Sequence, residues 1–172
     1  MFLKIVTTAF LLVCLNCDLH AQGSVTLNVN LYPIQTLVVN TSQKEVNLEY
    51  KTRADYRNGT VSELEDHLTI YSTGGFQVKV RAVTAANDKD VLDNVTVIAS
   101  SGSKPLNQSN VVYSDTIISE REQQIISATK GATDKSVNIS YKGAGNDTFI
   151  GFTKKNAPAN LSYSVVYTIV SQ

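Results

Sequence analysis

Histidine and cysteine carry much of the nucleophilic and metal chemistry of proteins, and this chain of 172 residues has two of each. Three of the four, Cys14, Cys17 and His20, lie in the first 21 residues, which have the pattern of a cleavable signal. His67 is therefore the sole histidine expected after cleavage. A Ser-His-Asp arrangement would have to use it, and zinc sites usually draw on several histidine or cysteine ligands. Because His67 is next to Leu68 in an alternating segment, we predict a surface histidine on a strand.

The other concentration of reactive groups is acidic. Residues 87–94 read Asn-Asp-Lys-Asp-Val-Leu-Asp-Asn. The segment lacks the loop glycine and final glutamate of an EF-hand, and Lys89 separates two of the acids, so a solvated connector fits better than a calcium site. Paired carboxylates for sugar hydrolysis are not excluded by composition, but the chain has no tryptophan for a sugar platform. We expect no enzyme activity, no metal and no cofactor.

The N-terminus is typical of an export signal. Residues 1–4 are positively charged, residues 5–15 are mostly apolar, and Ala21 is a small residue before the expected cleavage at Gln22. A lipoprotein signal with Cys17 acylated is the alternative, although the residues before Cys17 match a lipobox poorly. No stretch reaches the roughly 20 apolar residues of a membrane-spanning helix. We expect an exported chain that does not insert into a membrane.

Composition excludes two further classes. The chain has 15 Lys+Arg and 15 Asp+Glu, a net charge of zero and a pI near 6.7, so it offers no field for nucleic acid. In residues 22–172, Val, Ile and Thr total 43 while Leu, Ala and Met total 19, which favours strands over a helical bundle. These 151 residues are the size of one domain.

Period-two alternation of apolar residues predicts the strands. They cover residues 24–31, 34–39, 45–51, 67–72, 76–82, 91–99, 111–118, 123–128, 137–141 and 161–170. The Thr73-Gly74-Gly75 turn predicts a hairpin between two of them. Residues 55–65, around Asn58-Gly59, are predicted to form a loop. The pattern as a whole predicts an all-β sandwich over residues 34–172, with the sheet that takes residues 123–128 left open.

Seven Asn-x-Ser/Thr sequons occur, at Asn40, Asn58, Asn94, Asn107, Asn138, Asn146 and Asn160. In a eukaryotic secretory protein they would accept glycans. A chain rich in Asn, Ser and Thr also produces such triplets by chance, and we favour that interpretation.

The strand predicted over residues 24–31 is the informative one, because it follows closely on the signal and ends at Pro33. Its four apolar residues share one face. A terminal strand of this kind either joins its own sheet or completes another molecule's sheet through backbone hydrogen bonds and side-chain pockets. At roughly 1.5–3 kcal/mol for each buried side chain, four would contribute on the order of 6–12 kcal/mol before ordering costs.

The sequence resembles the structural pilins of the chaperone–usher pathway, in particular the cysteine-free colonisation-factor and capsule-forming subunits. The matching segments are residues 25–33, the Val46-x-Leu48-x-Tyr50 strand, residues 91–97 and residues 163–169. The resemblance implies an incomplete immunoglobulin-like fold that lacks one strand. A periplasmic chaperone holds such a subunit, an outer-membrane usher exports it, and the next subunit's N-terminal extension completes it.

The resemblance also implies site residues. The donor side chains in the extension, residues 22–33, would be Val25, Leu27, Val29 and Leu31. The strand lining the acceptor groove would carry Leu161, Tyr163, Val165, Tyr167 and Ile169. The expected function is a surface-fibre or coat subunit with a role in adhesion. We expect it in the periplasm in transit and then at the cell surface in a fimbrium, or secreted. Its expected partners are copies of itself or related subunits.

Two other functions stay open. The first is a self-complete secreted β-sandwich that binds a glycan, a protein or a cell-wall component. The second is an exported hydrolase built on His67 or on the acidic residues 87–94. The first strand separates these functions from the fibre, because a self-complete domain would pair it within its own sheet.

Overall fold

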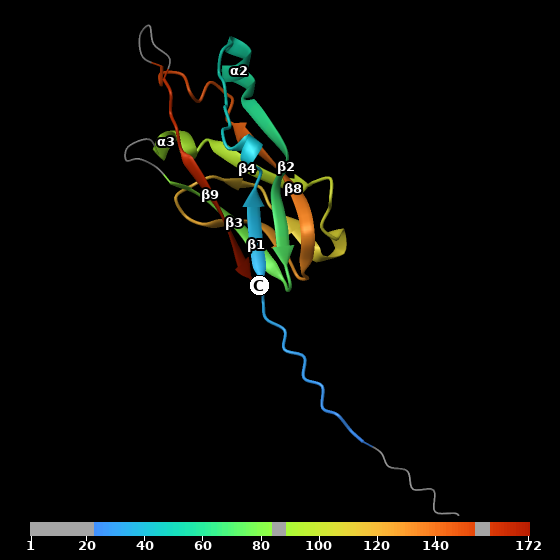
Figure 1. Ribbon diagram of the computed structural model, residues 1–172. Coiled ribbons are helices and arrows are strands. Elements are labelled where there is room, and N and C mark those ends of the chain that lie inside the picture. The colour runs from blue at the N-terminus through green and yellow to red at the C-terminus, as the bar shows by residue number, and fades with distance from the viewer. Residues whose placement is uncertain (1–22, 84–88, 154–158) are drawn as a thin grey trace, which may run out of the picture. The chain divides into compact units, whose positions relative to one another are not determined.

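Two antiparallel β-sheets pack face to face in the computed structural model, which describes residues 23–83, 89–153 and 159–172 (Figure 1). The first sheet has the strand order β1-β2-β8-β4-β6 and the second has the order β5-β7-β3-β9. The strands are β1 (Gln35–Val39), β2 (Thr60–Ser72), β3 (Phe76–Val83), β4 (Val95–Ser101), β5 (Val111–Tyr113), β6 (Thr116–Ile117), β7 (Gln123–Ala128), β8 (Ala132–Gly143) and β9 (Ser164–Ser171). The predicted all-β sandwich is confirmed.

Short helices connect some of the strands. They are η1 (Thr41–Gln43), α2 (Arg53–Asn58), α3 (Lys89–Leu92) and η2 (Gln108–Asn110). Residues Tyr32–Gln172 form one compact unit, to which the described residues 23–31 do not belong. The predicted signal, residues 1–21, lies outside the described residues.

The core lies between the sheets, where alternate side chains of each central strand point inward. Strand β3 supplies every second residue from Phe76 to Ala82, all of them buried, and β8 supplies buried residues in the same way. The largest fully buried side chains are Phe76, Leu68, Ile70, Ile118, Ile125, Ile126, Ile139, Val78, Val80, Val97 and Val137. They come from central strands of both sheets and from the segment after β6, so these elements hold the domain together.

The predicted hairpin across Thr73-Gly74-Gly75 is wrong. Strand β2 belongs to the first sheet and β3 to the second, so this turn carries the chain from one sheet to the other. It is tied to both terminal strands: the Thr73 N–H donates to the Ile34 carbonyl (3.0 Å) and the Gln172 N–H to the Gly75 carbonyl (3.1 Å). Alternation on both sides of a tight turn is common to hairpins and to crossings of this kind, so the sequence pattern does not separate them.

The prediction of a loop over residues 55–65 is also wrong, because these residues form most of α2 and the first part of β2. A capping box starts the helix: the Thr52 N–H donates to the Asp55 carboxylate (2.6 Å), and the Asp55 N–H donates to the Thr52 hydroxyl (3.3 Å). The helix ends at Gly59, whose φ of 82° lies in the left-handed region that favours glycine. The Thr-x-x-Asp spacing was the sequence signal for this helix.

Other predicted strands have different bounds. The residues predicted to alternate over 45–51 form no strand, and α3 occupies the start of the strand predicted over 91–99. The strand predicted over 111–118 is divided between β5 and β6, which belong to different sheets. Strand β7 pairs with β3 and β5, so residues 123–128 join the second sheet.

Candidate functional site

One lateral edge of the sandwich is covered by a segment that crosses between the two sheets, and we call this side the closed edge. After β5 the chain crosses from the second sheet to the first, where β6 pairs with β4. Backbone hydrogen bonds secure the crossing: the Ser114 N–H donates to the Ile125 carbonyl (2.9 Å), and the Ile118 N–H donates to the Val95 carbonyl (2.9 Å). The Ile118 side chain is buried beneath it. Backbone and side chains therefore both cover the core on this side.

At the opposite lateral edge, the residues that the structure describes form no such crossing. Among them, β1 pairs only with β2 in the first sheet, and β9 pairs only with β3 in the second. The Cα atoms of β1 and β9 come within 8 Å of one another, but no ladder joins the two strands. We call this side of the molecule, between β1 and β9, the open edge (Figure 1).

The apolar side chains of β9 reach the core but are not enclosed by it. Val165, Tyr167 and Ile169 pack against the core cluster and are only half-buried, as is Tyr163 just before the strand. Their neighbours across the ladder on β3 are buried. Leu161, predicted to belong to the same strand, precedes β9 by three residues and is 38% exposed.

The facing strand and the segment after it show the same incomplete burial. Leu37 and Val39 of β1 are half-buried against the core. Val46 and Leu48 also pack against the core half-buried, although residues 44–51 belong to no strand. The predicted alternation of residues 45–51 is therefore present, while the ladder that would make the segment a strand is not.

A polar cluster lies in the core behind the open edge. The hydroxyl groups of Tyr141 on β8 and Tyr167 on β9 are 2.6 Å apart, so one hydrogen bond joins the two sheets. Burial raises the pKa of Tyr141, and burial followed by the adjacent Tyr141 raises the pKa of Tyr167. Both tyrosines therefore stay neutral hydrogen-bonding groups at ordinary pH.

His67 belongs to this cluster, and its predicted surface position is wrong. The side chain is buried, and its ring lies edge-on to the Tyr167 ring, with the ring centroids 5.8 Å apart. The reason is a bulge in β2: the register to β8 shifts between Leu64 and Leu68, and Asp66 adopts a φ of 48°. The bulge turns His67 inward beside Leu68, which strict alternation does not allow.

The hydrogen bonds around His67 identify its neutral tautomer. The Gln43 side-chain amide donates from Nε2 to the Glu65 carbonyl (3.0 Å), which orients its Oε1 toward His67 Nδ1, also 3.0 Å away. Nδ1 must then carry the proton and donate it to Gln43. Burial lowers the pKa of His67, which favours the neutral ring. His67 is therefore a structural histidine, buried at the edge of the core and held by Gln43 and Tyr167.

The bulge itself is fixed from outside. The Asp66 carboxylate accepts hydrogen bonds from the Ser103 N–H (2.8 Å) and hydroxyl (2.5 Å), and these bonds lower its pKa. The Asp66 N–H donates to the side-chain oxygen of Asn138 (2.8 Å). Asp66 thus connects β2 to the loop after β4, which accounts for a carboxylate that sequence reasoning had not singled out.

The extension before the domain has unburied apolar side chains. Residues 23–31 form no strand, so the strand predicted over residues 24–31 is absent. Its four predicted donor side chains are exposed, at 94% for Val25, 84% for Leu27, 70% for Val29 and 88% for Leu31. Within the residues described, no ladder of either sheet includes this segment.

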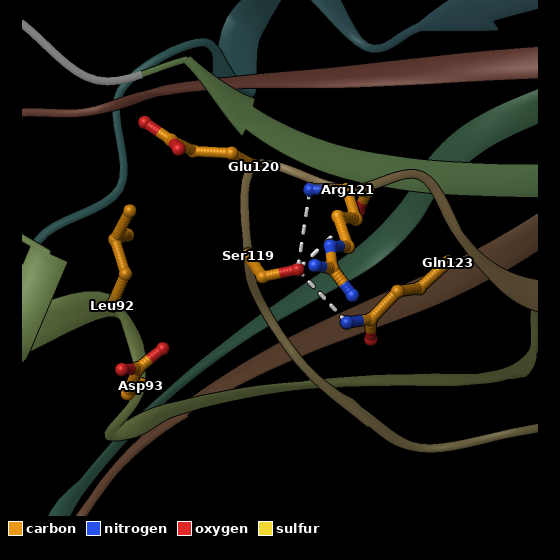
Figure 2. Close-up of a pocket in the computed structure, with 6 residues that line it drawn as sticks. All are labelled: Leu92, Asp93, Ser119, Glu120, Arg121 and Gln123. Atoms are coloured by element: carbon orange, nitrogen blue, oxygen red, sulfur yellow. Dashed lines mark hydrogen bonds between the residues drawn. The ribbon is translucent and has the colours of Figure 1, made fainter.

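A cavity of about 330 Å³ lies elsewhere, beside α3 and the loop before β7. Its lining residues are Leu92, Asp93, Ser119, Glu120, Arg121 and Gln123. Figure 2 shows the Ser119 hydroxyl accepting hydrogen bonds from the Arg121 N–H (3.3 Å) and the Gln123 side-chain amide (2.9 Å), with the carboxylates of Asp93 and Glu120 well apart. The charged residues are exposed, and the bonds close the loop on itself. Ser119, Arg121 and Gln123, which line this cavity, are thus held by hydrogen bonds around one loop.

The acidic segment over residues 87–94 forms no further site within the described residues. Asn87 and Asp88 of the acidic segment lie outside the described residues, and Asp90 lies in α3. Among the residues with defined placement, no three His, Cys, Asp or Glu side chains cluster as metal ligands. In the same part of the chain, no helix has the length and apolar character to cross a bilayer.

Two of the sequons have a structural role. Asn40 and Asn107 each precede a 3-10 helix, and the side-chain oxygen of each accepts hydrogen bonds from the N–H (3.1 Å in both) and the hydroxyl of the serine two residues later. The Asn-x-Ser spacing is therefore used here as a turn cap.

Comparison with protein families and with curated proteins gives no match. No protein-family model matches the sequence. No curated protein matches it at a significant level. The function has to be inferred from the open edge, the unburied extension and the sequence pattern.

Proposed function

We propose that the chain is an exported structural subunit of a surface fibre or coat, assembled by donation of its extension to the open edge of another copy. The observation that carries this proposal is incomplete burial of apolar side chains at two places, the open edge and the extension. We call these the two deficits. The domain has two edge strands whose inward side chains are half-buried, and the extension has four exposed apolar residues on one face. One strand added beside β9 would remove both deficits.

The start of β1 makes donation within one molecule unfavourable. To fold back beside β1, the extension would need a two-residue turn at Tyr32-Pro33 closed by a backbone pair between Leu31 and Ile34. Such turns favour residues with positive φ, whereas proline is fixed near −65°. The Ile34 N–H and carbonyl are also already bonded to Thr73, at 2.9 and 3.0 Å. Transfer to a second molecule avoids both obstacles.

Insertion requires the open edge to widen. A strand placed between two others needs two inter-strand spacings, about 9.5 Å in all. Because Cα atoms of β1 and β9 come within 8 Å, these strands have to separate as the donor enters. In the proposed function a periplasmic chaperone covers the open edge before assembly and an outer-membrane usher passes the subunit on, so that the edge does not close or associate wrongly.

The direct test is a charged substitution on the donor face with a control on the opposite face. Leu27→Asp would place a carboxylate in the apolar edge of the acceptor, whereas Asn28→Asp places the same charge on the face that points away. Surface material from cells producing the full chain is run unboiled on a denaturing gel. We expect a ladder of oligomers from the wild type and from Asn28→Asp, and loss of the ladder from Leu27→Asp.

The same experiment identifies the failure of the proposal. A single monomer band from the wild type would favour the self-complete binding module. An unchanged ladder from Leu27→Asp would show that the extension's apolar face is not the donor.

A further inference from the structure

The strand registers define two ends of the sandwich. At the turn end lie the Thr73-Gly74-Gly75 turn, the start of β1 and the end of β9, because Gln35 pairs with Ser72 and Ser171 with Phe76. At the helix end lie α2, the start of β2 and the start of β9 (Figure 1). Strand β9 thus runs from the helix end to the turn end.

The direction of the donated strand decides which ends meet. Because β1 and β9 run in opposite directions, a strand inserted between them is antiparallel to one and parallel to the other. Antiparallel pairing is slightly the more stable, and β9 has eight residues whereas β1 has five, so the longer antiparallel pair forms with β9. A donor antiparallel to β9 has Val25 near the turn end of the acceptor and Leu31 near its helix end. Residues 25–31 span about 20 Å and the eight residues of β9 about 24 Å, so Leu31 leaves within a residue or two of Ser164.

The linker between the donor strand and its own domain is very short. Only Tyr32 and Pro33 separate Leu31 from Ile34, and Ile34 is bonded to Thr73 at the turn end. Three Cα–Cα steps reach about 10 Å at most. The turn end of the donor subunit must therefore lie against the helix end of the acceptor.

Both surfaces that meet in this way carry exposed apolar side chains. At the turn end, Tyr32 is 77% and Ile34 54% exposed. At the helix end, Ile150 is 66% exposed, Phe152 is 39% exposed, and Leu161, three residues before β9, is 38% exposed.

Ile150 and Phe152 are held at the helix end by α2. The loop that carries them is tied to the helix by hydrogen bonds from the Asn146 N–H to the Arg57 carbonyl (2.7 Å) and from the Asp147 N–H to the Tyr56 carbonyl (2.9 Å). The Phe149 ring packs edge-on against Tyr50 and Phe152, with centroid distances of 4.9 and 5.9 Å. The loop that carries Ile150 and Phe152 is thus a fixed part of the fold.

We propose that the patch formed by Ile150, Phe152 and Leu161 is the docking surface for the turn end of the next copy of this chain, with Tyr32 and Ile34 covering it. The inference rests on the proposed function and adds a second contact to the donated strand. The two surfaces differ, so the contact is heterologous and repeats without closing, as an open fibre requires.

Cysteine cross-linking tests this junction, with Cys14→Ser and Cys17→Ser removing the chain's own thiols. Tyr32→Cys and Leu161→Cys are introduced together, and surface material is treated with a short bis-maleimide and boiled. Within one subunit the two thiols lie at opposite ends of β9, so a cross-link joins different subunits. We expect a covalent ladder beyond dimers from the double variant and, at most, dimers from either single variant.

The matched control moves the second thiol. Val112 is also exposed, but it lies at the turn end on the closed edge, because it pairs with Ser127 beside Ala128, the partner of Phe76. The pair Tyr32→Cys and Val112→Cys is expected to give no ladder beyond dimers. A ladder from this control, equal to that of Tyr32→Cys with Leu161→Cys, would overturn the assigned junction.

The side chains themselves are tested by charge. Ile150→Asp is expected to lower the temperature at which the unboiled wild-type ladder dissociates, and Val112→Asp is expected to leave that temperature unchanged. If the unboiled ladder forms but neither the covalent ladder nor this shift is seen, the docking surface is wrong and the donated strand stands. If the wild type forms no ladder, both proposals fail together.

Discussion

The two lateral edges of this sandwich both carry apolar side chains, and they differ in whether a backbone segment crosses between the sheets to cover those side chains. At the closed edge the chain crosses between the sheets, and Ile118 beneath it is 2% exposed. At the open edge, within the described part of the chain, β1 and β9 end the two sheets without a crossing, and Ile169 is half-buried. Ile118 is thus enclosed beneath the crossing segment, whereas Ile169 has no strand on the outer flank of β9.

The comparison also accounts for the polar groups near the open edge. His67 and Tyr141 are buried behind the half-buried Tyr167 of β9, and each of them makes a hydrogen bond. Buried polar groups are tolerated when they are paired. The Tyr141–Tyr167 bond therefore joins the two sheets at the open edge, where the described residues include no crossing strand, and the His67 bond joins β2 to η1.

The largest expected effect comes from removing matched side chains at the two edges. Ile118→Ala should lower the free energy of unfolding by about 2–5 kcal/mol, because it leaves a cavity in an enclosed site. Ile169→Ala should cost about 1 kcal/mol, because part of that side chain already faces water. Urea unfolding of the monomeric protein measures both. Equal costs would contradict the difference between the edges.

The next effect is stabilisation by an added strand. A synthetic peptide of residues 22–33 should bind the open edge and raise the free energy of unfolding, by about 2.7 kcal/mol at one hundred times its Kd. The same peptide with Leu27→Asp is the control and should give no stabilisation. With the wild-type peptide bound, the cost of Ile169→Ala should rise toward that of Ile118→Ala, because the donor encloses the site. Thermal or urea unfolding with and without peptide follows both changes.

A smaller effect is expected from the hydroxyl pair that joins the sheets. Tyr141→Phe leaves the Tyr167 hydroxyl without its partner and should cost about 1 kcal/mol. Tyr167→Phe should cost a similar amount, and the double variant should cost less than the sum of the two. A double-mutant cycle of unfolding free energies measures this coupling. Strict additivity would show that the two hydroxyls do not stabilise each other.

The smallest effect is a pH dependence from His67. Burial lowers its pKa below the ordinary value of about 6.5, so the unfolded chain binds the proton more readily than the folded one. The stability contribution of the neutral ring is present above pH 6.5 and is lost as the pH falls through the lower folded pKa. Unfolding midpoints measured between pH 7 and 5 should fall for the wild type and fall less for His67→Gln, which does not titrate.

Much of the fold could be predicted because alternation records which face of a strand is buried. Strands β1, β3, β7 and β9 lie within or close to their predicted ranges, and the regular alternation of Phe76 to Ala82 corresponds to four buried side chains. Alternation does not indicate which other strand a strand pairs with. For this reason the hairpin at Thr73-Gly74-Gly75 was predicted where the chain changes sheets.

The candidate site was less accessible from the sequence. Val165, Tyr167 and Ile169 lie in β9 as expected, and Tyr163 just precedes it, but only the strand order places β9 at an edge. His67 was assigned to the surface because the bulge at Asp66 leaves no pattern in the neighbouring apolar residues. Tyr50, Phe149 and Phe152 meet only because α2 and the loop after β8 meet, so the patch at the helix end had no sequence signal.

By itself the sequence determined that the chain is rich in strands, which faces of most strands are apolar, and that an alternating apolar segment precedes the domain. The tertiary structure decided which strands pair, which lateral edge stays open and that residues 23–31 take no place in either sheet. The physical reason is the separation along the chain of the residues involved. Side-chain alternation is a local property of each strand, whereas strand order and edge closure depend on contacts between residues far apart in the chain.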